Sequence, residues 1–151
     1  MYFGLIIFIF LTILTIIIAI LFTIAIDNLA RLSDSIDPLN NTIQDTIIGI
    51  GSFVVIFLIF LIAVGLIGAI LAFYYGRMNM SSNYIYYTMI VFIIATIGLL
   101  ILEFRTYREL LLYKPNVGDE NIVNQSINYI LWGIGLTVFM FILSLISIFF
   151  I

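Results

Sequence analysis

The stretch that decides the fold is residues 47–75, IIGIGSFVVIFLIFLIAVGLIGAILAFYY, which contains no charged side chain. A helix rises about 1.5 Å per residue, so this run is long enough to cross the roughly 30 Å hydrocarbon core of a bilayer. Lipid offers no hydrogen-bond partners to the backbone, and the run lacks the alternating polarity of a barrel strand. A transmembrane helix is therefore predicted here.

Three further stretches have the same character. The predicted spans are residues 2–26, 47–75, 84–102 and 127–151. The composition agrees with this reading, because 65% of the residues are hydrophobic and 9% are charged, against about 45–50% and about 25% in soluble domains. The sequence predicts an all-α membrane protein whose residues 1–151 form a single four-helix transmembrane domain.

Two connections on one side of the predicted bundle are long and polar. Asp37 followed by Pro38 has the pattern of an N-cap and a proline at the first helical position, so the second helix is expected to start early. The third helix is expected to stop before Pro115, and Asp119 to cap the fourth. These segments predict a small helical headpiece on the side opposite both chain ends. Most of the basic residues fall there, which favours the cytoplasmic side.

An internal repeat is suggested by an offset of 84 residues, which places Gly49-Ile50-Gly51 on Gly133-Ile134-Gly135 and Asn40 on Asn124. Phe8 falls on Phe92 at the same offset. The interpretation is two repeated helical hairpins, in residues 1–67 and 85–151, related by an axis along the membrane normal. The alternative is chance similarity in an isoleucine-rich chain. Duplication predicts that the two glycine pairs lie at equivalent depths.

The residue types that are missing exclude several kinds of chemistry. The chain has no cysteine and no histidine, so thiol catalysis, iron–sulfur ligation and histidine general-base catalysis have no residues to act through. The net charge is -3 without a basic cluster, so nucleic-acid binding lacks an electrostatic basis. No catalytic residue, metal ligand or cofactor site is predicted.

Small and hydroxyl side chains recur at helical spacing in three of the predicted spans, the first, the second and the fourth. Small residues allow close helix contacts in lipid, where packing drives association. The residues predicted to pack helices together are Gly65, Gly68, Ala69, Ala72, Gly133, Thr137 and Ser144. Leu61 is expected to face lipid instead. The alternative is a polar lining for a pore, but none of these stripes contains a charge.

Glu103 directly follows the third predicted span, and in the repeat alignment it lies opposite Ala19, deeper than Asp27. Its expected role is an ion pair at the membrane interface with Arg31, Arg105 or Arg108. The alternative is a proton or ion site, because carboxyl groups inside membranes often serve that purpose.

The expected function follows from packing surfaces combined with the absence of catalytic groups. We expect a non-catalytic structural or assembly subunit of a larger membrane complex, in a viral internal membrane or capsid-associated assembly or in an organellar energy-converting complex. Its expected partners are membrane lipids and other membrane or peripheral subunits, with a homo-oligomer left open and nucleic acid excluded. The alternative is a small channel or transporter formed between the two hairpins.

Overall fold

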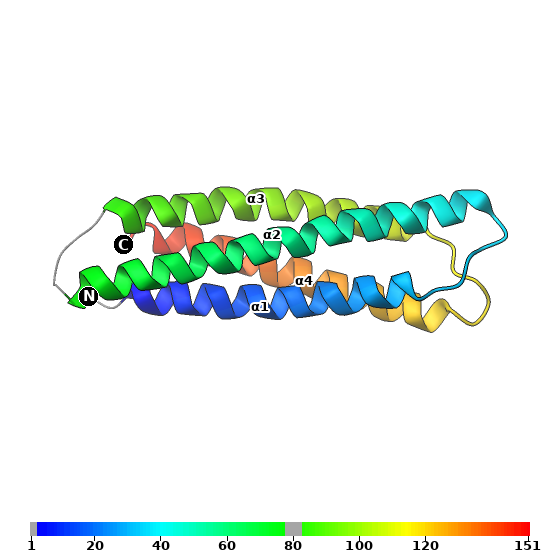
Figure 1. Cartoon of the computed structure of the whole chain (residues 1–151), viewed down its shortest axis with the longest axis horizontal. Coiled ribbons are helices and arrows are strands. Elements are labelled where there is room, and N and C mark those ends of the chain that lie inside the picture. Colours follow the sequence, from blue (N-terminus) through cyan, green and yellow to red (C-terminus); the bar gives the residue numbers. More distant parts are fainter. Residues whose placement is uncertain (1–2, 78–82) are drawn as a thin grey trace.

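The computed structural model describes residues 3–77 and 83–151, which form a bundle of long helices (Figure 1). Helix α1 spans Phe3–Ala30, α2 Pro38–Arg77, α3 Asn83–Leu112 and α4 Glu120–Ser147. In this part of the chain, four helices are long and apolar enough to cross a membrane. The predicted all-α fold, with four helices that could span a membrane, is confirmed.

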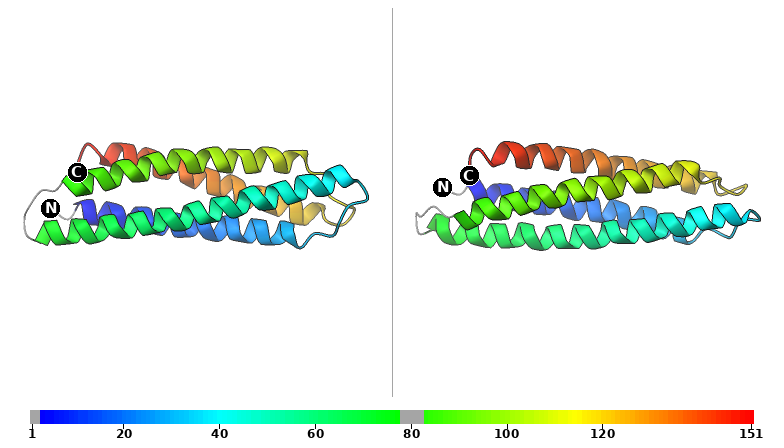
Figure 2. Two further views of the ribbon diagram at one scale, coloured as in Figure 1. Left: turned by 45° about the horizontal axis from the view of Figure 1, so that its top comes forward. Right: turned by 90° about the horizontal axis from the view of Figure 1, so that it is seen from above.

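Successive helices run in opposite directions, so both chain ends lie at the same end of the bundle (Figures 1 and 2). Helix α1 packs against α2 and α4, and α3 packs against the same two helices. At the end with the termini, the rings of Phe3 and Phe150 meet edge to face with centroids 6.0 Å apart. The connections 31–37 and 113–119 lie at the opposite end.

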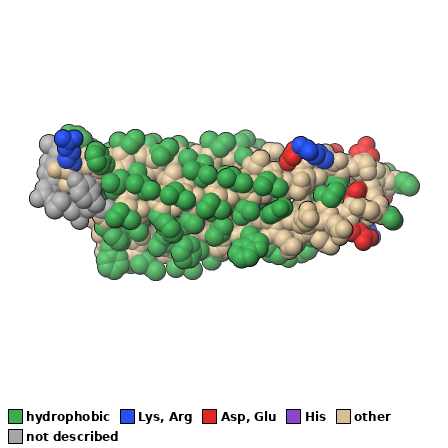
Figure 3. Space-filling view, turned by 90° about the horizontal axis from the view of Figure 1, so that it is seen from below, with side chains coloured by type: hydrophobic (Ala, Val, Ile, Leu, Met, Phe, Trp, Pro, Cys, Tyr) green, Lys and Arg blue, Asp and Glu red, His purple; other side chains and the backbone are tan. Residues whose placement is uncertain are grey.

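The helices are longer than a bilayer requires. Helix α2 has 40 residues, which at about 1.5 Å per residue is about twice the roughly 30 Å of a hydrocarbon core. Figure 3 shows that acidic side chains gather towards the end that carries the two polar connections, while hydrophobic side chains cover most of the rest of that face. The helices therefore extend past their apolar portions at that end.

Helix α2 begins at Pro38, as the sequence predicts. The Leu39 backbone N–H donates to Asp37 Oδ1 at 3.0 Å, so Asp37 caps the helix that begins at Pro38. Asp119 precedes α4 but makes no capping hydrogen bond through its side chain. In the described residues this end consists of the ends of the long helices and two loops. The predicted headpiece is not seen as a separate helical unit.

Two buried amide side chains hold the polar end together. Asn40 Nδ2 donates to the Lys114 carbonyl at 2.8 Å, and the Lys114 N–H donates to Asn40 Oδ1 at 2.9 Å. Gln44 Nε2 donates to the carbonyls of Leu29 at 2.9 Å and Leu32 at 3.3 Å. The Leu29 carbonyl belongs to the last turn of α1, and Leu32 follows the end of that helix, so Gln44 ties α2 to the C-terminal end of α1. The role of Gln44 could not be predicted from the sequence.

The centre of the bundle is filled by large apolar side chains. Those with no measurable exposure are Phe8, Leu11, Ile18, Phe22, Val54, Leu58, Leu61, Met89, Phe92, Leu99, Ile130 and Met140. The expectation that Leu61 faces lipid is wrong. Leu61 lies one helical turn from Gly65 and therefore shares the buried face of α2.

The predicted repeat matches the burial pattern in one half only. At the 84-residue offset, Phe8 and Phe92 are both buried, so α1 and α3 turn corresponding faces inward. In the second helices the offset fails, because Asn40 is buried and Asn124 is exposed. One residue along a helix turns a side chain by about 100°, and the buried faces of α2 and α4 correspond better at an offset of 83, as Val54 and Thr137 do. The structure does not confirm repeated hairpins.

Candidate functional site

The glycines of the predicted packing stripes face neighbouring helices. Gly68 lies against the ring of Phe8, and Gly65 lies against Thr12, both on α1. Gly133 of α4 faces Phe22, where a Cβ atom on the glycine would come within 2.5 Å of a ring carbon. Ala69, Ala72 and Ser144 are also buried. The absence of a Cβ at these glycines allows α1 to approach α2 and α4 closely.

The buried hydroxyl groups use their protons within their own helices. Each of these groups donates to the carbonyl four residues earlier: Thr12, Thr15, Thr96, Thr106, Ser126, Thr137, Ser144 and Ser147. Between them lie fully buried apolar side chains such as Phe92 and Leu99. A hydroxyl committed to its own helix adds little polarity to the interior, so this arrangement favours packing over a pore lining.

Glu103 on α3 is fully buried and faces α4. Thr137 Oγ1 lies 2.8 Å from Glu103 Oε1 and also 2.8 Å from the Gly133 carbonyl. The second carboxyl oxygen, Oε2, is buried without a hydrogen-bond partner in the structure. No sequence pattern connects positions 103 and 137, so the sequence suggested each residue separately but not their contact.

The predicted ion pair of Glu103 with Arg31, Arg105 or Arg108 is wrong. Arg31 instead pairs with Asp27 on its own helix, with Nη2 and Oδ2 3.1 Å apart. Arg105 is exposed, because two residues along a helix turn a side chain by about 200° and bring it to the opposite side from Glu103. Thr137 is therefore the partner of Glu103 among the residues that the structure describes.

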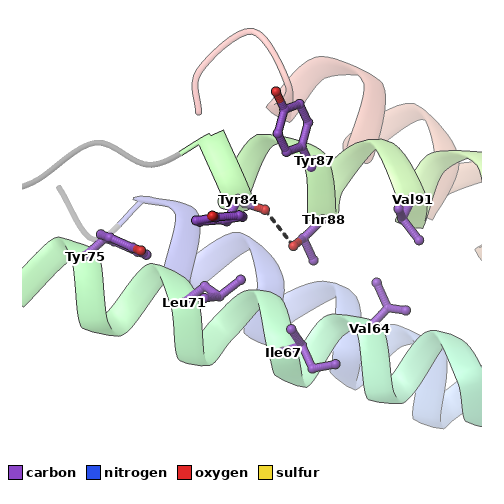
Figure 4. Close-up of a pocket in the computed structure, with 8 residues that line it drawn as sticks. All are labelled: Val64, Ile67, Leu71, Tyr75, Tyr84, Tyr87, Thr88 and Val91. Atoms are coloured by element: carbon purple, nitrogen blue, oxygen red, sulfur yellow. Dashed lines mark hydrogen bonds between the residues drawn. The ribbon is translucent and has the colours of Figure 1, made fainter.

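A groove of about 540 Å³ lies between α2 and α3 near the end with the termini (Figure 4). Val64, Ile67 and Leu71 of α2 and Val91 of α3 line it, and its tyrosines lie towards the end of the bundle with the termini, as Figure 4 shows. The hydroxyl of Thr88, which also lines it, donates to the Tyr84 carbonyl at 2.7 Å. The groove is thus apolar along its length and polar at one end.

Tyr113, which directly follows α3, has a raised pKa. Burial raises the pKa of the Tyr113 hydroxyl, and the negative charge of Asp119 raises it further. The phenol is therefore neutral over the physiological range. Within residues 3–77 and 83–151, acidic side chains do not form groups of three that could hold a metal ion.

These features define the class of protein. Four helices long and apolar enough to span a membrane are consistent with an integral membrane protein, and one of these helices, α3, carries the fully buried carboxyl group of Glu103. No protein-family model, no curated protein and no solved structure matches the chain.

Proposed function

We propose that the chain is a non-catalytic structural or assembly subunit of a larger membrane complex. The observation that carries this proposal is the contrast between a filled centre and unpartnered outer faces. Each helix exposes large apolar side chains, such as Ile13, Ile56, Ile94 and Ile142. Contiguous apolar surface of this kind mediates contact with lipid or with other membrane proteins.

The proposed partners are membrane lipids and other membrane or peripheral subunits, with assembly of several copies of the chain left open. The groove between α2 and α3 suits a lipid acyl chain, because its walls are apolar and its tyrosines lie at one end of the bundle. Aromatic side chains of this kind concentrate at membrane interfaces. A viral internal membrane or an organellar energy-converting complex would provide such partners.

Duplication of one hairpin belongs to this proposal as an account of how the bundle arose. Its support is the matched sequence and the corresponding burial of α1 and α3, as at Phe8 and Phe92. The polar end of the bundle, with the buried Asn40 and Gln44, is the surface that we propose for docking of peripheral subunits.

The second candidate function is a small channel or transporter formed between the two hairpins. The observation that favours it is Glu103, since a carboxyl group buried in a membrane bundle is commonly part of a proton or ion path. Against it stand the large side chains that fill the bundle on either side of this level, including Phe22 and Leu99.

Ion flux in liposomes distinguishes the two candidates. The purified chain, reconstituted into liposomes with a proton or potassium gradient, should dissipate the gradient no faster than empty liposomes do. The physical reason is the filled core, which leaves no continuous path for water. A flux faster than that of empty liposomes, and lost in the Glu103→Gln variant, would contradict the structural role and favour transport. The variant is a suitable control because it keeps the shape of the side chain.

A further inference from the structure

The interface between α3 and α4 contains a hydrogen-bond arrangement that needs one more proton than Thr137 can supply. Thr137 Oγ1 lies 2.8 Å from the Gly133 carbonyl and 2.8 Å from Glu103 Oε1. The carbonyl can only accept, and a hydroxyl group has a single proton to donate. If the hydroxyl donates to Gly133, the short contact with Glu103 requires a proton from the carboxyl group.

The alternative assignment gives the hydroxyl proton to an ionised Glu103. The carboxylate would then have one donor for its two oxygens, because Oε2 is buried without a partner. An ionised carboxyl group removed from water needs several donors or an opposite charge to offset its lost solvation. The surroundings are apolar instead. Leu99 lies one turn away on α3, and the ring of Phe22 lies against Gly133.

The charged groups of the neighbouring helices do not supply an opposite charge. In α4 the ionisable residues are Glu120 and Tyr129, both nearer the polar loop than Gly133. Asp45 of α2 is exposed, and Asp27 of α1 is occupied by Arg31. In α3 itself the groups near Glu103 are Arg105, Tyr107, Arg108 and Glu109, of which both arginines are exposed. Throughout the described residues, the partner found for Glu103 is a hydroxyl group.

We propose that Glu103 and Thr137 form a proton-binding site. In this site Glu103 is a neutral carboxylic acid whose O–H, on Oε1, donates to Thr137 Oγ1, and the Thr137 hydroxyl donates in turn to the Gly133 carbonyl. Each proton then has one acceptor. The ligand is a proton rather than a metal ion, because one carboxyl group and one hydroxyl do not provide the ligand set that a cation needs.

The site gives the subunit a property beyond a structural role. Release of the proton would leave a carboxylate with a single donor in the contact between α3 and α4, beside Leu99 and close to the level of Phe22. Binding of the proton therefore favours the packed arrangement of these two helices.

Infrared spectroscopy of the full chain in lipid at neutral pH tests the proposal. A protonated carboxyl group has a carbonyl stretch that ionised carboxylates lack. We expect this band in the wild type and its loss in Glu103→Gln, whose amide keeps the shape and can still donate to Thr137. The control is Asp119→Asn, because Asp119 Oδ2 is the other carboxyl oxygen in the structure that is buried without a partner. The carbonyl band of the protonated carboxyl group should remain in the Asp119→Asn variant.

A second variant, Thr137→Val, keeps the proposal testable if Glu103→Gln does not fold. Thr137→Val removes the acceptor of the Glu103 proton while preserving the side-chain shape, so the band should remain and move in frequency. Absence of the band from the wild type would overturn the proposal. So would a band that survives in Glu103→Gln, one lost in Asp119→Asn, or one unmoved in Thr137→Val.

Discussion

Gly133→Leu is expected to destabilise the bundle strongly, on the order of 3 kcal/mol, which is at the upper end of the usual cost of overpacking a core. The reason is steric. The first added carbon alone would come within 2.5 Å of a ring carbon of Phe22, and that ring is fully buried. The thermal midpoint of unfolding in detergent, followed by the loss of the folded peak in size-exclusion chromatography, should fall clearly below that of the wild type.

Gly135→Leu is the matched control, because it makes the same change two residues further along α4. Gly135 is exposed and has nothing near the position of an added Cβ. Its midpoint should differ little from that of the wild type, as is usual for substitutions outside the core. Equal loss of stability in the two variants would contradict the packing of α4 against α1.

Asn40→Ala is expected to produce the second large effect, about 2–3 kcal/mol. The side chain is 4% exposed and makes two hydrogen bonds to the backbone of Lys114. Its removal loses both hydrogen bonds, each of which contributes about 0.5–1.5 kcal/mol net to stability. The free energy of unfolding in denaturant should fall by this amount, with earlier proteolysis in the 113–119 loop.

Asn124→Ala is the control for this experiment, since the 84-residue offset makes it the counterpart of Asn40. Asn124 is exposed, so its substitution should change stability by less than about 0.5 kcal/mol. If both variants lost the same stability, the two asparagines would have equivalent roles. That outcome would support the duplication and contradict the burial pattern of α4.

The four helices could be predicted from the sequence because lipid leaves the backbone few choices. An uncharged run such as residues 47–75 is helical whatever its neighbours are, since every peptide group must bond within the segment. The start of α2 at Pro38 was likewise predictable, because Asp37 and Pro38 act on the adjacent backbone. Both features depend on local interactions.

Side-chain orientation could not be predicted as well, because it depends on contacts between helices. The prediction that Leu61 faces lipid is wrong, and its spacing from Gly65 puts both residues on one face of α2. The predicted partner of Glu103 is an arginine, because opposite charges near one another in the sequence favour an ion pair. The sequence does not show which way each side chain points. Its contact with Thr137 depends on the angle and register of α3 and α4, which no residue pattern reports.

The most direct test of the proposed function is the mass and composition of the native particle extracted from its membrane in mild detergent. The chain has a mass of 17.2 kDa. A structural or assembly subunit should be recovered in a particle many times larger, with other protein chains present in fixed ratios to it. Recovery of this chain without other proteins, as a monomer or as an assembly of identical copies, would contradict a role as a subunit of a larger complex.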